Sequence, residues 1–314
     1  MTAGKPHSPR GARIVEVAAQ AKINLRLRIL AREASGYHQL ETLFLRIDLA
    51  DTVRVRRTSG DRSLDVAGEF DPAMLGPVEK NLAWRAAEAY FAARGARGGF
   101  AIELTKRIPI GGGLGGGSAD AGAVLRALGA MEDAPIESRS LLSLAAGLGA
   151  DVTFLATEHA YALAWGRGER MLALTPPPSR DLLLVVPQFA VKTAEAFGWL
   201  ADPEVLTAGR RSVEAELLRP ELLSSWEALE TLVGNDFEGA VGARHPEIDR
   251  HLDDLRSAGC GIRMLSGSGS TVFGVWTSTS LEPSPAKEPF EPDASAKYIR
   301  TRSSMRVEQV SVIE

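Results

Sequence analysis

The sequence predicts an α+β fold with a mostly antiparallel sheet. Three strand-like segments open the chain without a helix between them, at residues 12–30, 40–49 and 52–57. Further along, two helical patterns follow each other directly, at residues 118–130 and 138–149. Strands that follow strands and helices that follow helices are typical of α+β proteins, whereas a parallel sheet needs alternating strands and helices.

The first strand is predicted from its period of two. Ile23 and Leu25 alternate with Lys22, Asn24 and Arg26, so one face is apolar and the other polar. The loop ASGYHQ then leads into the second strand, as expected for an antiparallel pair. Lys22 and Asn24 therefore share one face, which either lines a cleft or is simply solvated.

The remaining elements are predicted from the same two periodicities. Apolar residues at helical spacing predict helices at residues 81–94, 194–200, 213–218 and 246–257. Short apolar runs predict strands at residues 100–105, 182–186, 261–265, 271–276 and 306–313.

The chain of 314 residues is long enough for two domains. We expect an N-terminal domain at residues 11–165 and a C-terminal domain at residues 166–314, with the strongest loop signal, TPPPS, at residues 175–179. Four prolines at residues 281–293 exclude a continuous helix or a central strand there. We expect that segment to form a surface loop.

Composition and charge exclude several classes of function. The net charge of −4 gives no overall positive field for nucleic acid or an acidic membrane. Cys260 is the only cysteine, which excludes an intrachain disulfide and a cysteine zinc cluster, and we expect it to be a buried apolar residue. No apolar run is long enough to span a bilayer, and the first ten residues lack the apolar region of a secretory signal. We therefore expect a soluble cytoplasmic protein.

The most informative motif is PIGGGLGGGSAD at residues 109–120. Six of the seven residues at positions 111–117 are glycine, so backbone N–H groups can close around an anion. The predicted helix that follows adds unpaired donors and a partial positive charge at its N-terminus. A polyphosphate ligand fits this combination.

Three other phosphate loops and a flexible linker are alternatives. The P-loop needs Lys-Ser/Thr after its last glycine, where this chain has Ser118 and Ala119. A dinucleotide-binding loop is formally matched by Gly111, Gly113 and Gly116, but a second helix follows where the second strand should come. A protein-kinase loop needs a β-hairpin and a His-Arg-Asp motif, which are missing. A linker does not usually lie between a strand and an amphipathic helix.

Three motifs together resemble the GHMP kinase family. The glycine segment is similar to the family's phosphate loop, QAKINLRLRIL at residues 20–30 to its first motif, and LSGSGSTVFGV at residues 265–275 to its third. The resemblance implies the two-domain GHMP kinase fold, with an N-terminal domain like ribosomal protein S5 domain 2 and a ferredoxin-like C-terminal domain. It also implies a small-molecule kinase that uses ATP and Mg²⁺ to phosphorylate an alcohol.

The resemblance implies a role for individual residues. Asp151 is the expected catalytic base, with Lys22 beside it to stabilise charge that develops during phosphoryl transfer. Asn81 is expected at the adenine, and no residues are assigned to the metal with certainty. The expected triphosphate site consists of Pro109, Ile110, Gly111, Gly112, Gly113, Leu114, Gly115, Gly116, Gly117, Ser118 and Ala119. The expected substrate contacts are Asn24, Tyr37, His38 and Thr193.

The triplet Gly36-Tyr37-His38 narrows the substrate class. With the segments GADVTF, AWGRGE, VKTAEAF and NDFE, it resembles the branch of the family that phosphorylates the C2 hydroxyl of a cytidine diphosphate-linked methylerythritol in isoprenoid biosynthesis. Tyr37 and His38 supply stacking surface and hydrogen-bonding groups for a cytosine ring. Alone, they would be ordinary loop residues. A homoserine or mevalonate-type kinase remains the main alternative, with a catalytically inactive relative and a nicotinamide-dependent dehydrogenase as other classes.

Four features depart from the family pattern. Gln20 and Thr153 stand where proline is usual, and Ala119 and Asp120 replace Ser-Asn. The proline-rich segment at residues 281–293 replaces an expected helix. We expect a monomer or weak homodimer whose partners are the small-molecule substrate and ATP.

Overall fold

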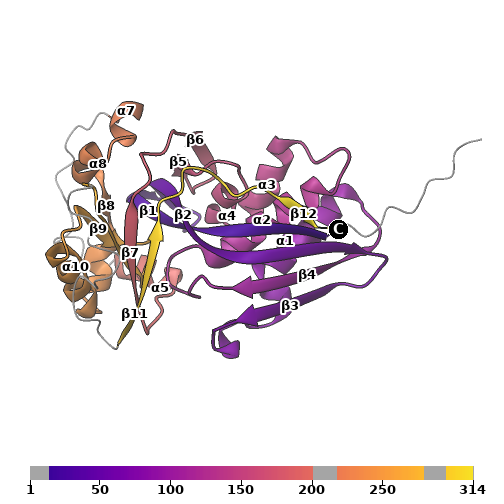
Figure 1. Cartoon of the computed structure of the whole chain (residues 1–314), viewed down its shortest axis with the longest axis horizontal. Coiled ribbons are helices and arrows are strands. Elements are labelled where there is room, and N and C mark those ends of the chain that lie inside the picture. The colour runs from indigo at the N-terminus through magenta and orange to yellow at the C-terminus, as the bar shows by residue number, and fades with distance from the viewer. Residues whose placement is uncertain (1–13, 201–217, 279–294, 314) are drawn as a thin grey trace, which may run out of the picture.

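The computed structural model describes residues 14–200, 218–278 and 295–313. The expected loop at residues 281–293 and most of the helix expected at residues 213–218 lie outside these ranges. Two sheets make up the fold, and they lie side by side in Figure 1. The first carries the long strands near the N-terminus, and the second belongs to the later part of the chain.

The first sheet has eight strands, five of which follow the order β12-β1-β2-β4-β3. Of the other three, β5 pairs with β2, β6 pairs with β5, and β8 pairs with β1. Its strands are β1 (Ile14–Arg32), β2 (His38–Thr58), β3 (Ser63–Gly68), β4 (Gly99–Lys106), β5 (Tyr161–Gly166), β6 (Arg170–Ala173), β8 (Gly234–Asn235) and β12 (Ser311–Ile313). The pairs are antiparallel except β3 with β4 and β1 with β8. The antiparallel prediction is confirmed.

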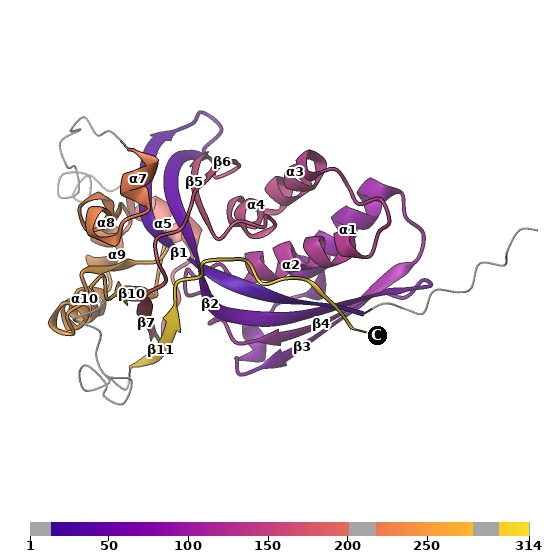
Figure 2. The ribbon, with the colours of Figure 1, turned by 45° about the horizontal axis from the view of Figure 1, so that its top comes forward.

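Helices cover one face of the first sheet (Figure 2). They are α1 (Leu82–Arg94), α2 (Gly116–Ala130), α3 (Ser138–Leu148) and α4 (Ala150–Leu155). The face is built by alternation, because Ile23 and Leu25 of β1 are fully buried with Val124 and Leu125 of α2 in one apolar cluster. Alanine and glycine dominate α2, so the helix packs close to the strands below it.

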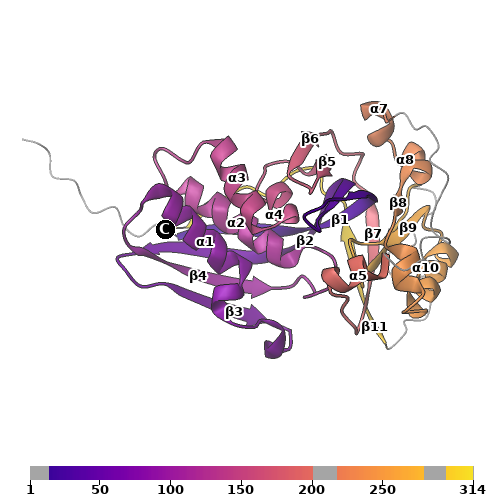
Figure 3. The same ribbon diagram turned by 180° about the vertical axis from the view of Figure 1, so that it is seen from behind.

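The second sheet has four strands in the order β11-β7-β10-β9 and carries the later helices (Figure 3). Its strands are β7 (Asp181–Pro187), β9 (Ile262–Leu265), β10 (Val272–Val275) and β11 (Ala296–Arg302). The helices are α5 (Thr193–Leu200), α7 (Pro220–Leu223), α8 (Trp226–Leu232), α9 (Glu238–Gly242) and α10 (Glu247–Ser257), and two short 3₁₀ turns, Pro72–Met74 and Val78–Lys80, precede α1. Cys260 is buried in the apolar cluster under this sheet, as expected. Within the described residues, no helix combines the length and the apolar character needed to cross a bilayer.

Several elements differ from the expected ones, and β3, β5, β6, β8, β11, α4, α7, α8 and α9 were not predicted at all. The two strands expected at residues 40–49 and 52–57 form one continuous strand, β2, which pairs with β1, β4 and β5. The strand expected at residues 306–313 is limited to β12, and β11 lies before it. The two strands join different sheets because the segment between them crosses from one sheet to the other. The domain division at residue 165 stays a prediction.

Gln20 attaches the C-terminal segment to the middle of β1. Its Nε2 atom donates to Ser304 Oγ at 2.7 Å, and its Oε1 atom accepts from the Glu308 N–H at 3.0 Å. On α2, Arg126 donates to the Glu308 carbonyl oxygen at 2.6 Å. A proline at position 20, as in the family pattern, could make neither side-chain hydrogen bond.

Candidate active site

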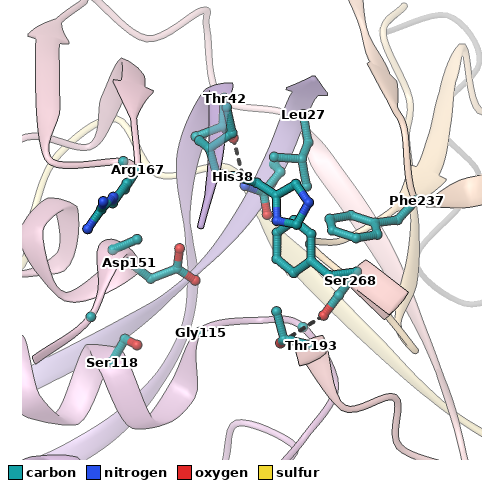
Figure 4. A pocket seen from close by; sticks show the side chains of 18 of the residues that line it. Leu27, His38, Thr42, Gly115, Ser118, Asp151, Arg167, Thr193, Phe237 and Ser268 are labelled. Carbon is teal, nitrogen blue, oxygen red and sulfur yellow. Dashed lines mark hydrogen bonds between the residues drawn. The ribbon is translucent and has the colours of Figure 1, made fainter. Parts of the chain in front are cut away.

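A large cleft lies beside the phosphate loop, α4, α5 and the tip of the β1–β2 hairpin. Figure 4 shows part of it, with Asp151 and Ser118 on one side and His38, Thr193 and Ser268 on the other. Every residue that the sequence predicted for the site lines this cleft, with the exception of Ala119. The fold therefore gathers the predicted residues, which come from distant parts of the chain, around one cleft.

The centre of the cleft holds an ion pair between Lys22 and Asp151. Lys22 Nζ lies 3.3 Å from Asp151 Oδ2, and the carboxylate side chain keeps 33% of its surface exposed. Asp151 lies in the first turn of α4. The helix predicted at residues 138–149 ends just before Asp151, and in the structure Gly149 has an extended backbone and separates α3 from α4. Thr153 stands where the family usually has proline, and this difference does not prevent the contact between Lys22 and Asp151.

The polar face of β1 is buried and not solvated. Lys22 and Asn24 are 2% and 3% exposed. Lys22 Nζ donates to Asn24 Oδ1 at 2.7 Å and to the Gly113 carbonyl oxygen at 2.8 Å. Asn24 Nδ2 in turn donates to Thr42 Oγ1 on β2 at 2.8 Å. This chain of hydrogen bonds fixes the ammonium between the phosphate loop and Asp151.

The phosphate loop depends on glycine at specific positions. Gly113 has φ +77°, and a Cβ atom there would lie 2.2 Å from the Ser266 carbonyl oxygen. Gly115 has φ +73° and precedes α2, which begins at Gly116, two residues earlier than expected. Ser118, in the first turn, also lines the cleft, so the free N–H groups of this turn can meet an anion.

The third motif forms a turn that packs on the phosphate loop. Ser266 Oγ donates to the Gly113 carbonyl oxygen at 3.0 Å, and the Thr271 N–H donates to the Gly112 carbonyl oxygen at 3.2 Å. Asn235 holds the turn from the other side, since its Nδ2 atom donates to the carbonyl oxygens of Leu265 and Gly267. A turn of the second sheet therefore supports the phosphate loop, which lies between β4 and α2 beside the first sheet.

A buried charge cluster lies at the start of α2. Lys106 Nζ contacts Asp51 and donates to Asp120 Oδ2 at 2.7 Å. Ala119 points into the apolar core beside it and presents no side chain to the cleft. Burial and the Asp51 carboxylate together raise the pKa of Asp120 to about 7, although the charge of Lys106 acts to lower it. The same two carboxylates keep the pKa of Lys106 raised although its burial acts in the opposite direction.

The other end of the cleft is aromatic. The rings of His38 and Phe197 stack with centroids 4.4 Å apart, and Phe237 meets Phe197 edge-on at 5.0 Å. Burial and the charge of Arg32 lower the pKa of His38. Tyr37 is 60% exposed and lies under the Arg167 guanidinium. The arrangement offers flat faces and ring nitrogens to a planar ligand.

Two predicted contacts have protein partners of their own. Thr193 Oγ1 lies 3.0 Å from Ser268 Oγ, so one of the two hydroxyls donates to the other. Asn81 caps α1, because its Oδ1 atom accepts from the Ala83 N–H at 2.9 Å. The Nδ2 group of Asn81 is then the part of this side chain that could contact a nucleotide.

No role was predicted for five residues of the cleft and its surroundings, namely Phe197, Phe237, Arg167, Lys106 and Asp51. The first three stand within segments that carried the resemblance, VKTAEAF, NDFE and AWGRGE, so the signal was present without a role. Lys106 and Asp51 had no such signal. Their approach depends on the pairing of β2 with β4, which sets Thr52 opposite Thr105.

Protein ligands for Mg²⁺ are few. Among the described residues, no group of three His, Cys, Asp or Glu side chains could hold a metal ion. The Ser118 hydroxyl and the Asp151 carboxylate both face the cleft beside the phosphate loop. Oxygen donors of this kind suit Mg²⁺ when the nucleotide phosphates and water supply the other ligands.

Comparisons with known proteins agree with this geometry. The model of the GHMP kinases N terminal domain matches residues 81–161. A 4-diphosphocytidyl-2-C-methyl-D-erythritol kinase from Desulfotalea psychrophila is 38% identical over 264 residues, covering 83% of this chain and 85% of the relative. A protein of the same name from Anaeromyxobacter dehalogenans is 40% identical, covering 82% and 79%.

Solved structures give the same result for the fold. A crystal structure of 4-(cytidine 5'-diphospho)-2C-methyl-D-erythritol kinase superposes with a TM-score of 0.68 at 32% identity, covering 92% of this chain and 98% of that one. The homoserine kinase from Cytophaga hutchinsonii has a TM-score of 0.70 at 19% identity, which concerns the fold alone. These findings exclude the dinucleotide-binding alternative and confirm the α+β GHMP kinase fold. The chain belongs to the GHMP kinases, within the family of 4-diphosphocytidyl-2-C-methyl-D-erythritol kinases.

Proposed function

We propose that the protein transfers the γ-phosphoryl group of ATP to the C2 hydroxyl of 4-diphosphocytidyl-2-C-methyl-D-erythritol, in the non-mevalonate route to isoprenoid precursors. The observation that carries this proposal is the position of the Lys22–Asp151 pair, with the phosphate loop on one side and the aromatic residues on the other. The names of the relatives support the substrate. A reaction that starts from ATP fits a cytoplasmic enzyme, and we retain the expectation of a monomer or weak homodimer.

The triphosphate would bind along residues 109–118. The loop glycines, three of which have positive φ, carry no Cβ atom that would shield their backbone N–H groups, and the first turn of α2 adds further donors. Asn81 would contact the adenine through Nδ2, since its oxygen caps α1. Mg²⁺, when bound, would neutralise the β- and γ-phosphates, with Ser118 and Asp151 the nearest oxygen donors in the cleft.

Phosphoryl transfer needs an aligned hydroxyl and stabilisation of charge more than covalent help from the protein. Asp151 would accept the proton of the C2 hydroxyl as its oxygen attacks the γ-phosphorus. Lys22 would stabilise the charge on the transferring group, because its ammonium is fixed by Gly113 and Asn24. The amide of Asn24 is engaged with Lys22 and Thr42, so we assign Asn24 to orienting Lys22 and through it the substrate.

The cytidine end of the substrate would bind at the aromatic residues. Tyr37 offers an exposed ring, and His38 is held against Phe197 with its ring edge available for hydrogen bonds. Thr193, with its partner Ser268, would contact a substrate hydroxyl or the diphosphate. A substrate without a base, such as homoserine or mevalonate, would leave these groups unused.

A coupled assay of ADP release tests the proposal. The enzyme receives ATP and Mg²⁺ with 4-diphosphocytidyl-2-C-methyl-D-erythritol, homoserine or mevalonate in parallel reactions. We expect ADP release with the cytidine substrate alone. Release with homoserine or mevalonate would overturn the substrate, and no release with any of the three would favour the inactive relative.

A further inference from the structure

Arg167 lies in a tightly constrained turn at the edge of the cleft. The turn joins β5 to β6, and Gly166 and Gly168 on either side have φ +77° and +104°. The Arg167 N–H donates to Glu169 Oε2 at 2.7 Å, which closes the turn. A Cβ atom on Gly168 would lie 3.0 Å from the Ala150 Cβ, so the turn packs directly beside the residue that precedes Asp151.

The Arg167 side chain reaches across to the tip of the β1–β2 hairpin. Its guanidinium carbon lies 4.2 Å from the centroid of the Tyr37 ring. Both Nε and Nη2 donate to the Glu33 carboxylate, and Nη2 also lies 3.3 Å from Ser35 Oγ. Hydrogen bonding to Arg167 and Ser35 lowers the pKa of Glu33, which therefore stays charged. One guanidinium thus joins an ion pair and a ring contact.

The hairpin tip holds Tyr37 from the backbone side. The Glu33 N–H donates to the Tyr37 carbonyl oxygen at 2.7 Å, and the Gly36 N–H donates to the Glu33 carbonyl oxygen at 2.9 Å. Gly36 has φ +87°, a conformation that favours glycine. Tyr37 is nevertheless 60% exposed, so its ring still presents surface to the cleft after Arg167 has covered one face.

We propose that Arg167 is a positioning residue for the cytosine base: it stacks on one face of Tyr37 and holds the ring so that the other face can receive the base. The proposal rests on the function proposed above. A ring on an exposed hairpin tip loses freedom when a ligand stacks on it, and a ring that is already held loses less. An isolated surface ion pair is usually of little consequence. Here the Arg167 guanidinium that pairs with Glu33 also covers the Tyr37 ring. The ion pair can therefore affect substrate affinity through the position of that ring.

Arg167→Ala tests the proposal through the separation of KM from kcat. We expect the KM for the cytidine substrate to rise roughly threefold to tenfold, as the loss of a cation–π contact suggests. The KM for ATP and kcat should stay within about twofold. Arg167→Lys should give an intermediate KM, because an ammonium cannot form the planar stack or the paired hydrogen bonds.

A double-mutant cycle with Tyr37→Ala shows whether Arg167 acts through the ring. We expect Arg167→Ala to change the substrate KM by less than about twofold once Tyr37 is alanine. Arg62→Ala is the matched control, because Arg62 also pairs with a glutamate, Glu88, and lies 5.7 Å from the Phe100 ring outside the cleft. That control should leave the substrate KM unchanged.

The outcomes separate this proposal from the proposed function. If the wild-type enzyme does not phosphorylate the cytidine substrate, the proposed function fails. If it does, and Arg167→Ala leaves the substrate KM unchanged or shifts the KM for ATP as strongly, the positioning role is overturned. Full additivity with Tyr37→Ala would also overturn it.

Discussion

The two ends of the cleft are built on opposite principles. At the phosphate end, Lys22, Asn24 and Asp120 are almost completely buried and are held by several hydrogen bonds each or by a salt bridge. At the aromatic end, Tyr37 is mostly exposed, and its position depends on side-chain contacts between two hairpins. The proposed transfer chemistry thus rests on a buried hydrogen-bond network around Lys22, whereas the proposed base recognition lies on a surface that is easier to alter. Variants at the two ends should differ in which kinetic constant they change.

The largest effect is expected from Asp151→Asn at the centre of the cleft. Removal of the proposed base should lower kcat by roughly 10²-fold to 10⁴-fold, with little change in either KM. Asp151 is partly exposed and the amide has the same shape, so the variant should unfold at nearly the wild-type temperature. Turnover close to wild type in a folded variant would show that Asp151 is not the base.

The phosphate end should be intolerant of a single methyl group. Gly113→Ala would place a Cβ atom against the Ser266 carbonyl oxygen at a left-handed backbone position. We expect the KM for ATP to rise at least about tenfold and the unfolding temperature to fall, because the loop must shift. Gly129→Ala on α2 is the control, since a Cβ atom there meets nothing within 4 Å and alanine favours the helix. Equal ATP affinity in the two variants would contradict the packing argument.

The aromatic end should respond in affinity for the cytidine substrate alone. His38→Ala removes a ring from the stack with Phe197, and we expect the substrate KM to rise about tenfold with the KM for ATP unchanged. His245→Ala removes a comparable stack, on Phe189 at 4.1 Å, and His245 does not line the cleft. A similar change in both variants would point to general loosening instead of base recognition.

The smallest effect is expected from Asp120→Asn, and it should depend on pH. The pKa of Asp120 is raised from an ordinary value of 3.8 to about 7 in the folded protein, so the folded state binds the proton more tightly. That contribution to stability is complete below pH 3.8 and is lost as the pH rises towards 7. The unfolding temperature of Asp120→Asn relative to wild type should therefore increase by a few degrees between about pH 5 and about pH 8.

Asp253→Asn controls for the loss of a carboxylate, because the Asp253 side chain is 65% exposed. Its unfolding temperature relative to wild type should not change across the same pH range. A pH-independent difference for Asp120→Asn would mean that Asp120 carries no extra proton in the folded state.

Much of the fold could be predicted because its signals are local. The alternation in β1 and the glycines before α2 determine the strand, the helix and the phosphate loop without distant information. The end of α3 at Gly149 was predicted, but the short helix α4 that begins directly after it was missed, because glycine is compatible with both the end of one helix and the start of another. The site residues came from the family resemblance, which names positions but not their hydrogen bonds.

The parts that could not be predicted depend on tertiary contacts. Lys106 and Asp51 meet only through strand pairing, and Arg167 meets Tyr37 across 130 positions of sequence between two hairpin tips. Whether the polar face of β1 would be solvated or buried also depended on the cover supplied by the phosphate loop. Periodicity alone assigns residues to a face but does not say what lies against it.

The attachment of Gln20 to Ser304 has a consequence for synthesis of the chain. The two residues are 284 positions apart, and Gln20 lies two residues before Lys22 on the strand that carries the proposed catalytic ammonium. At ordinary translation rates, several tens of seconds separate their appearance. During this interval β1 lacks the partner strand β12 and the hydrogen bonds of its Gln20 side chain. The nascent N-terminal region therefore has an unpaired strand edge, open to other chains, until residues 304–313 have left the ribosome.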